Sequence, residues 1–273
     1  MEKIKNWLIT GDTHGSFGRF TNIANKFKNG STAIIILGDA GINYYQNEND
    51  AFLKRSITRK YPQRFYMVYG NHEIRPTSIP GVKSMYDKDV DGLVWYEEAF
   101  PNLRYFDLYG TYNINGHPTA VIGGAYSVDK YWRLARGAKW FEEEQLTETE
   151  REECEHYLTL PSHGQFDFVL SHTCPYAWMP TDKFLPNVDQ STVDNSTELW
   201  LQKLKDKIKW NVWVFGHYHC DRIERPHVEM MFTDVEELET IWERWNVKPD
   251  LDWWLYKGPN YYLNDEKWKE IKE

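Results

Sequence analysis

The chain has 273 residues, 41% of them hydrophobic and 27% charged, a balance typical of a globular protein with a substantial core. Its net charge of −9 argues against a general nucleic-acid binder or a protein held on anionic membranes, because both usually carry basic faces. Three scattered cysteines make no disulfide framework, and no apolar stretch approaches the ~18 residues of a membrane span. We therefore expect a cytoplasmic protein.

Short apolar segments that end abruptly in polar clusters are the main feature of the sequence. Segments of this length bounded by glycine predict buried strands. In chain order they are 4–10, 33–37, 65–69, 166–170 and 212–215, followed by GDTHG, GD, GNHE, SH and GHYH. Between them, 104–108, 112–114 and 119–122 predict consecutive strands joined by short turns, which makes the expected sheet mixed.

Helical patterns separate many of these strands. The first expected helix has an apolar face. Asn195 is a candidate N-cap for a second helix. Two capping-box motifs, Thr147-x-x-Glu150 and Thr233-x-x-Glu236, predict the start of two more. The apolar positions are Phe17, Phe20, Ile23, Ala24 and Phe27; Trp200, Leu201, Leu204 and Ile208; Cys154, Tyr157 and Leu158; and Val235, Leu238, Ile241, Trp242 and Trp245. This alternation predicts an α/β architecture, in which ligands bind beyond the carboxyl ends of the strands.

The polar clusters supply a set of metal-ligating side chains at that place. In Asp12-x-His14 and His217-x-His219, alternate residues of an extended segment point the same way and can place two donors on one ion. Mixed oxygen and imidazole donors suit Mn²⁺, Fe or Zn²⁺, and seven donors exceed the need of one tetrahedral Zn²⁺. We therefore expect two divalent metal ions that share one carboxylate. The candidate ligands are Asp12, His14, Asp39, Asn71, His172, His217 and His219.

The five motifs, in this order, resemble those of the calcineurin-like metallophosphoesterase superfamily over roughly residues 4–220. The resemblance implies a four-layer fold of α/β (α+β) type, a β-sandwich of two mixed sheets flanked by helices. It also implies that Asp12, His14 and His219 bind the first metal, that Asn71, His172 and His217 bind the second, and that Asp39 bridges both. His72 corresponds to the catalytic histidine.

A dinuclear centre of this kind would keep a net positive charge, because the positive charge of two divalent ions exceeds the negative charge of two aspartates. It can hold a phosphate and lower the pKa of a bridging water, so that hydroxide attacks phosphorus in line while His72 protonates the leaving oxygen. We expect hydrolysis of a phosphodiester or small phosphomonoester. The expected partner is a phosphorylated small molecule or nucleotide, with no membrane and no general nucleic-acid binding.

The second motif departs from one branch of the superfamily. Protein Ser/Thr phosphatases carry GDxxDRG, whereas residues 38–44 read GDAGINY, without the second Asp and the Arg. The departure argues against a protein phosphatase and leaves the group that orients His72 unidentified. Two alternatives stay open: a non-catalytic scaffold of this fold that binds a protein partner, and a DNA nuclease.

Other candidate features are weaker. Arg75 and Arg133 are candidates for substrate binding, and residues 126–165 are long enough to form a partial lid. We expect a catalytic domain over residues 1–227 and an aromatic-rich extension over 228–273. That extension packs on the same domain or on a second copy, as a homo-oligomer. Cys174 and Cys220 are expected to be packed rather than ligating, and His117, His156, His163 and His227 to be ordinary.

Overall fold

The computed structural model describes residues 3–26, 30–186 and 188–247, which form two stacked mixed sheets. In sheet A, four neighbouring parallel strands are extended by antiparallel strands at both edges. Its order is β13 (Val235–Glu237), β1 (Asn6–Thr10), β2 (Thr32–Ile36), β3 (Arg64–Met67), β6 (Leu103–Phe106), β5 (Gly92–Glu97) and β4 (Val82–Asp87).

Sheet B has the same design, with parallel strands at its centre and one antiparallel strand at each edge. Its order is β11 (Arg222–Arg225), β12 (Val228–Met230), β10 (Lys209–Phe215), β9 (Gln165–Ser171), β8 (His117–Ile122) and β7 (Tyr109–Ile114).

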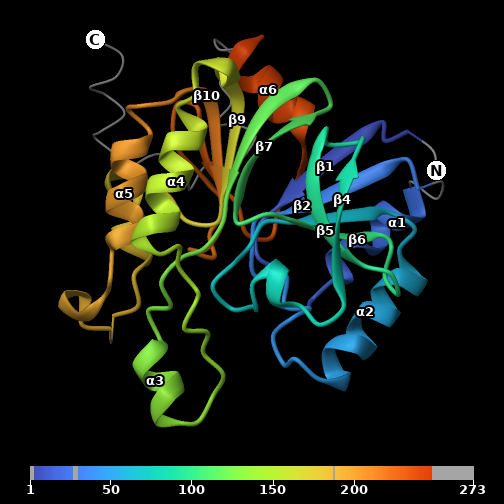
Figure 1. The fold of residues 1–273 in the computed structure, drawn as a ribbon, viewed down its shortest axis with the longest axis horizontal. Coiled ribbons are helices and arrows are strands. Elements are labelled where there is room, and N and C mark those ends of the chain that lie inside the picture. Colours follow the sequence, from blue (N-terminus) through green and yellow to red (C-terminus); the bar gives the residue numbers. More distant parts are fainter. Residues whose placement is uncertain (1–2, 27–29, 187, 248–273) are drawn as a thin grey trace.

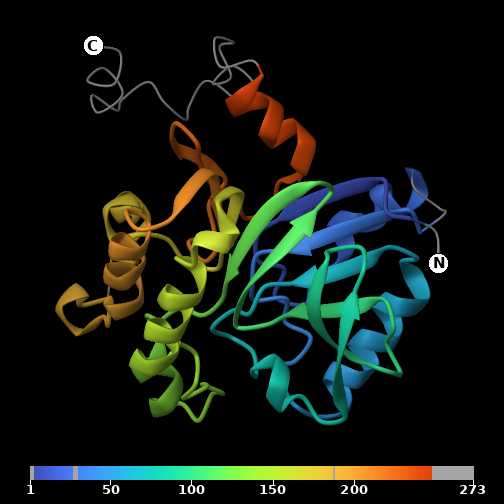
Figure 2. The same ribbon diagram turned by 45° about the horizontal axis from the view of Figure 1, so that its top comes forward.

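Helices cover the outer faces of both sheets (Figure 1). The helices α1 (Thr21–Lys26) and α2 (Glu48–Lys60) lie beside sheet A, and α4 (Glu148–Leu158) and α5 (Ser196–Leu204) lie beside sheet B. The remaining described α-helices are α3 (Lys130–Ala135), which projects from the body of the molecule, and α6 (Leu238–Asn246), drawn in red in Figure 2. Short 3₁₀ turns cover 18–20, 76–78, 161–163, 176–178, 181–183 and 190–192.

Alternation along the buried strands builds three apolar layers. In β1, Trp7 and Ile9 face the core between the sheets, whereas Leu8 faces the helices outside sheet A. In β10, Val214 enters the core between the sheets and Phe215 packs with α4 and α5. A strand with both faces buried reads as a continuous apolar run, as the sequence does here. The predicted four-layer sandwich of two mixed sheets flanked by helices is confirmed.

Three expectations differ from the structure. The helix expected after Thr233 begins at Leu238, because residues 235–237 instead pair with β1 as strand β13. The three strands expected in sequence around 104–122 divide between the sheets: β6 joins sheet A, and the hairpin of β7 and β8 joins sheet B. The first helix begins with a 3₁₀ turn, and Phe27 lies outside the described residues.

The chain after position 227 contributes to the fold as far as residue 247. Strand β12 pairs with β10, and in α6 both Ile241 and Trp245 enter the core between the sheets. The expected packing of residues 248–273 lies outside the described part of the chain.

Among the described helices, none has the length and hydrophobicity that a membrane crossing requires.

Candidate metal centre

The loops that follow the buried strands meet at one edge of the sandwich, and backbone hydrogen bonds join them. The N–H of His14 donates to the carbonyl oxygen of Asp39 (2.9 Å), which ties the first two motifs together. Within sheet B, the N–H of Gly216 donates to the carbonyl of His172 (3.0 Å), and across the sandwich the N–H of His217 donates to Asp12 Oδ1 (3.0 Å). The two sheets therefore deliver their polar residues to one place.

The first group of donors consists of Asp12, His14 and His219. His219 Nε2 lies 3.3 Å from Asp12 Oδ2 and 2.8 Å from His14 Nε2, and His14 Nε2 lies 3.8 Å from Asp12 Oδ2. The carboxylate is buried, whereas both imidazoles are reached by solvent. This arrangement is an open site with one oxygen and two nitrogen donors.

The second group lies against the first and is deeper. His172 Nε2 is 2.8 Å from Asn71 Oδ1 and 3.7 Å from Asp39 Oδ1, and His217 Nδ1 is 3.2 Å from Asn71 Oδ1. Asp12, Asp39 and His172 also offer ligand atoms within 4.8 Å of one another, so Asp12 belongs to both groups. The structure thus brings all seven candidate ligands together.

Contacts behind the ligands fix which atoms face the centre. His172 Nδ1 lies 2.7 Å from the Leu37 carbonyl oxygen, which can only accept, so Nδ1 carries the proton and Nε2 faces the site. The Ser127 hydroxyl donates to Glu144 and accepts from Asn71 Nδ2 (2.8 Å), which leaves Asn71 Oδ1 turned toward His172. The sequence analysis missed Ser127 and Glu144, since no local pattern marks them.

Backbone conformation and close packing at the centre add a constraint of their own. His14, Asp39, His217 and His219 have φ of 44°, 49°, 70° and 51°, in the left-handed region that costs non-glycine residues free energy. Glycine is required beside Asp39, because a Cβ on Gly70 would lie 2.1 Å from Asp39 Oδ1. Strain of this kind persists where the surrounding structure enforces it, as at ligand-binding sites.

The electrostatics hold Asp12 and His217 in the protonation states that metals need, whereas the hydrogen bond to Asp12 raises the pKa of His219. Burial opposes ionisation of Asp12, but the neighbouring imidazoles, above all His219, outweigh it and lower the pKa of the carboxyl. Burial lowers the pKa of His217 to about 3, so its imidazole is neutral at physiological pH. Carboxylates and neutral imidazoles are the ligand forms of these side chains.

The donor set fits divalent cations. Asp12 Oδ2 is buried and accepts no hydrogen bond from the described residues. In addition, His172 Nε2 and Asn71 Oδ1 face each other at 2.8 Å, and with a neutral imidazole both are acceptors. Acceptors that converge without donors in a buried site are stabilised by a cation between them. The mixture of oxygen and nitrogen atoms suits transition-metal ions.

His72 lies beside this centre, next to Arg133. The backbone N–H of His72 donates to Asp39 Oδ1 (2.8 Å). The ring nitrogen Nε2 of His72 is 3.9 Å from Asp39 Oδ2 and 3.4 Å from a guanidinium nitrogen of Arg133. Arg133 is in turn held by Asp129 (2.8 Å) and the Tyr44 hydroxyl (2.9 Å). Burial lowers the pKa of His72. The His72 ring therefore lies beside Asp39 and Arg133, and also beside His14 and Asn71, whose Nδ2 is 3.4 Å from His72 Nε2.

Arg75, the other arginine considered from the sequence, is not brought to the centre. Its guanidinium pairs with Glu150 (3.1 Å) and donates to the carbonyl oxygens of Glu143 (3.1 Å) and Gln145 (2.8 Å). It fixes the segment that leads into α4, where the predicted capping box of Thr147 and Glu150 is present.

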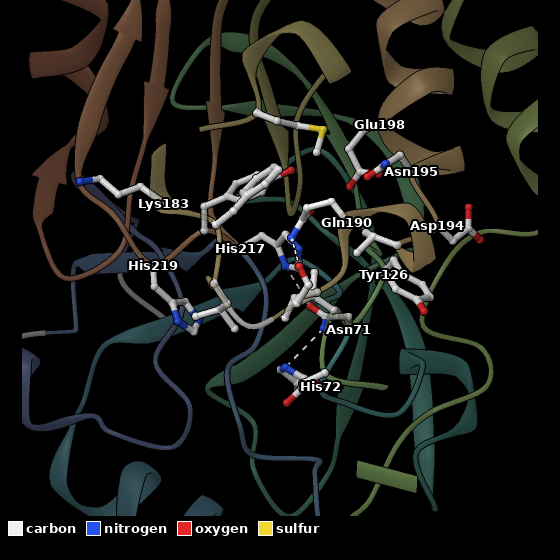
Figure 3. Close-up of a pocket in the computed structure, with 18 of the residues that line it drawn as sticks. Asn71, His72, Tyr126, Lys183, Gln190, Asp194, Asn195, Glu198, His217 and His219 are labelled. Atoms are coloured by element: carbon white, nitrogen blue, oxygen red, sulfur yellow. Dashed lines mark hydrogen bonds between the residues drawn. The ribbon is translucent and has the colours of Figure 1, made fainter. Parts of the chain in front are cut away.

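A cavity of about 580 Å³ extends from the metal centre to the segment between β9 and α5 (Figure 3). Its near end holds His72, Arg133 and five of the seven candidate ligands. Its far end has apolar walls and five polar side chains. The apolar residues are Met179, Phe184, Leu185, Val188 and Val193, and the polar ones are Lys183, Gln190, Asp194, Asn195 and Glu198.

The cysteines near the centre are not among its donor groups. Cys174 is buried and Cys220 is partly buried, and both are free thiols. Burial raises the pKa of each, which disfavours the thiolate that ligates metals.

Comparison with known proteins gives the family. The model of the calcineurin-like phosphoesterase family matches residues 6–221, and the chain belongs to this family. It is a phosphoester hydrolase of a metal-dependent family, in agreement with the Asp and His clusters above. A search of curated proteins gives no significant match.

Several solved structures are similar to this chain at low sequence identity. A phosphopantetheinyl hydrolase from Mycobacterium tuberculosis is 15% identical, with 83% of this chain and 88% of that chain covered and a TM-score of 0.43. The protein TT1561 of Thermus thermophilus is 12% identical, with 86% and 98% covered and a TM-score of 0.42. A 5′-nucleotidase from Candida albicans is 13% identical, with 85% and 46% covered and a TM-score of 0.38.

Proposed function

We propose that the protein hydrolyses a phosphodiester or small phosphomonoester with the help of two divalent metal ions. Asp12, His14 and His219 hold the first ion in this proposal. The second is held by Asn71, His172 and His217, and Asp39 lies between them. The observation that supports it best is the convergence of two adjacent donor groups, which share the buried carboxylate of Asp12, at the end of one cavity.

When bound, the ions supply Lewis-acid stabilisation of the phosphoryl oxygens and activate water for attack on phosphorus. The residues of the chain add three functions to this chemistry. Arg133 lines the cavity with a guanidinium that can bind two phosphate oxygens at once. His72, 3.4 Å from that guanidinium, exchanges a proton with the leaving oxygen. Ser127 holds Asn71 in its ligating orientation.

Manganese is the metal we propose first, with iron and zinc as alternatives, because oxygen and imidazole donors are mixed in both groups. The shape of the cavity favours a small phosphorylated molecule over a phosphorylated protein. A concave space of about 580 Å³ falls in the range of small-molecule sites.

The test is hydrolysis of p-nitrophenyl phosphate and bis(p-nitrophenyl) phosphate with Mn²⁺, Fe²⁺ or Zn²⁺ supplied. We expect turnover that is lost in EDTA and in Asp39→Asn, and that falls about 10²–10⁴-fold in His72→Ala. Arg55→Lys, altered at an exposed arginine of α2 that lies outside the cavity, is the control and should keep the rate. If metal-loaded protein releases nothing from either ester, the proposal fails and a non-catalytic scaffold becomes the better explanation.

A further inference from the structure

The cavity is larger than a phosphate group needs. Sites of 300–1,000 Å³ typically enclose drug-sized ligands, and this one has about 580 Å³. Only its near end is lined by the metal-ligand candidates and Arg133. The far end therefore has room for the organic part of a phosphoester, and Tyr126, Tyr218 and apolar side chains such as Met179 line the cavity.

Glu198 is the unusual residue of this far end. It lies in the first turn of α5, lines the cavity and is only 3% exposed. Its Oε1 accepts a hydrogen bond from the Thr173 hydroxyl (2.8 Å), whereas Oε2 is buried and accepts none from the described residues. A buried carboxylate oxygen without a donor is destabilising, so its presence requires an explanation.

The position of Glu198 is fixed relative to the metal centre. Thr173 follows the ligand candidate His172 directly, and its hydroxyl lies 3.1 Å from that of Tyr218, which stands between His217 and His219. Glu198 is thus tied to the segments that carry three of the ligands. Figure 3 shows Glu198 and Asn195 together, on the side of the cavity away from His72, with Lys183 apart from them.

We propose that the far end of the cavity is a subsite for a nucleoside-sized organic group, and that Glu198 Oε2 accepts a hydrogen bond from an amino group of it. The assignment rests on the proposed function, since the phosphate of the same molecule would lie at the metal centre. The apolar walls exclude water from this hydrogen bond. A ligand that lacks the amino group would therefore leave the carboxylate oxygen unpaired and would bind more weakly. An anionic group close to Glu198 and Asp194 would be repelled, since Lys183, which also lines the cavity, lies apart from them.

The experiment uses adenosine and purine riboside, which differ only in the amino group of the base and carry no phosphate. Both are titrated by calorimetry at pH 8, where the Glu198 carboxyl is mostly ionised, into the metal-loaded and the EDTA-treated protein. We expect adenosine to bind about tenfold or more tightly, the range for a hydrogen bond to a buried charged acceptor. The preference should vanish in Glu198→Gln and in Glu198→Met, which has no acceptor. It should persist in Glu152→Gln, altered at an exposed glutamate of α4.

Equal affinities in the wild-type protein, no binding of either nucleoside, or an unchanged preference in folded Glu198 variants would each overturn the subsite. Hydrolysis of adenosine 5′-monophosphate by the metal-loaded protein is measured separately. Discrimination between the nucleosides without hydrolysis of any ester keeps the subsite and refutes the proposed function, whereas hydrolysis of phosphoesters without discrimination does the reverse.

Discussion

Replacing Glu198 by glutamine should make the stability of the protein less dependent on pH. Burial raises the pKa of Glu198 to about 7 from an ordinary value of 4.5. Between these two values the folded state binds more protons than the unfolded state, so the free energy of unfolding falls as pH rises. A pKa difference of about 2.5, at 1.36 kcal/mol for each unit, corresponds to about 3 kcal/mol lost by pH 8. At pH 5 the loss is below about 1 kcal/mol.

The measurement is urea unfolding of the wild-type protein, Glu198→Gln and Glu152→Gln at pH 5 and pH 8. EDTA is present throughout, so that the pH dependence of metal binding does not enter. Glutamine keeps the volume of the side chain and an oxygen for the Thr173 hydroxyl. We compare the free energy of unfolding of each variant with that of the wild type. For Glu198→Gln, we expect this difference to be about 2–3 kcal/mol more favourable at pH 8 than at pH 5. For Glu152→Gln, it should be the same at both pH values. The same pH dependence in wild type and Glu198→Gln would refute the reasoning.

Further predictions concern a substrate contact, a ligand support and a buried ion pair. Arg133→Lys keeps the charge but loses the planar fork, so KM for a chromogenic ester should rise about tenfold; an unchanged KM would contradict a phosphate contact. Ser127→Ala removes the acceptor of Asn71 Nδ2 and should weaken metal affinity about 10–100-fold in a chelator competition, whereas equal affinity would exclude a supporting role. Arg244→Ala leaves the fully buried Glu229 without its cation and should cost about 3 kcal/mol in urea unfolding; a loss below about 1 kcal/mol would contradict that value.

The position of the metal centre could be predicted because each part of it is local in the sequence. A buried strand has to be apolar, and the residue after it is released from that requirement, so a cluster such as residues 217–219 stands out directly after β10. Parallel neighbours then place such clusters at one edge of the sheet. What the motifs could not show is how deep each residue lies. Asp12 is fully buried, whereas His219 is half exposed.

Elements that depend on distant partners were harder to predict. Residues 235–237 follow a capping-box motif, which predicts a helix, but they pair with β1 as an edge strand. The hydrogen bonds of this pairing stabilise the segment more than a helix cap of about 1 kcal/mol would. Helix α2 was missed for a related reason. Two of the three residues that it buries are Asp50 and Lys54, which bind backbone N–H groups and Glu97. Its buried face therefore has only a short apolar pattern, Leu53 and Ile57.

Glu198 shows the same limit at the site itself. From the sequence, α5 was identified by the apolar positions Leu201 and Leu204, and an acid in the first turn is the ordinary complement of a helix N-terminus. In the structure its carboxylate binds Thr173, 25 residues away, instead of solvent. In this chain the candidate metal ligands directly follow buried strands, so the sequence alone reveals them. Residues that select the substrate depend on how a loop and a helix pack over the cavity, so a buried charge kept at a cost in stability is the better guide to them.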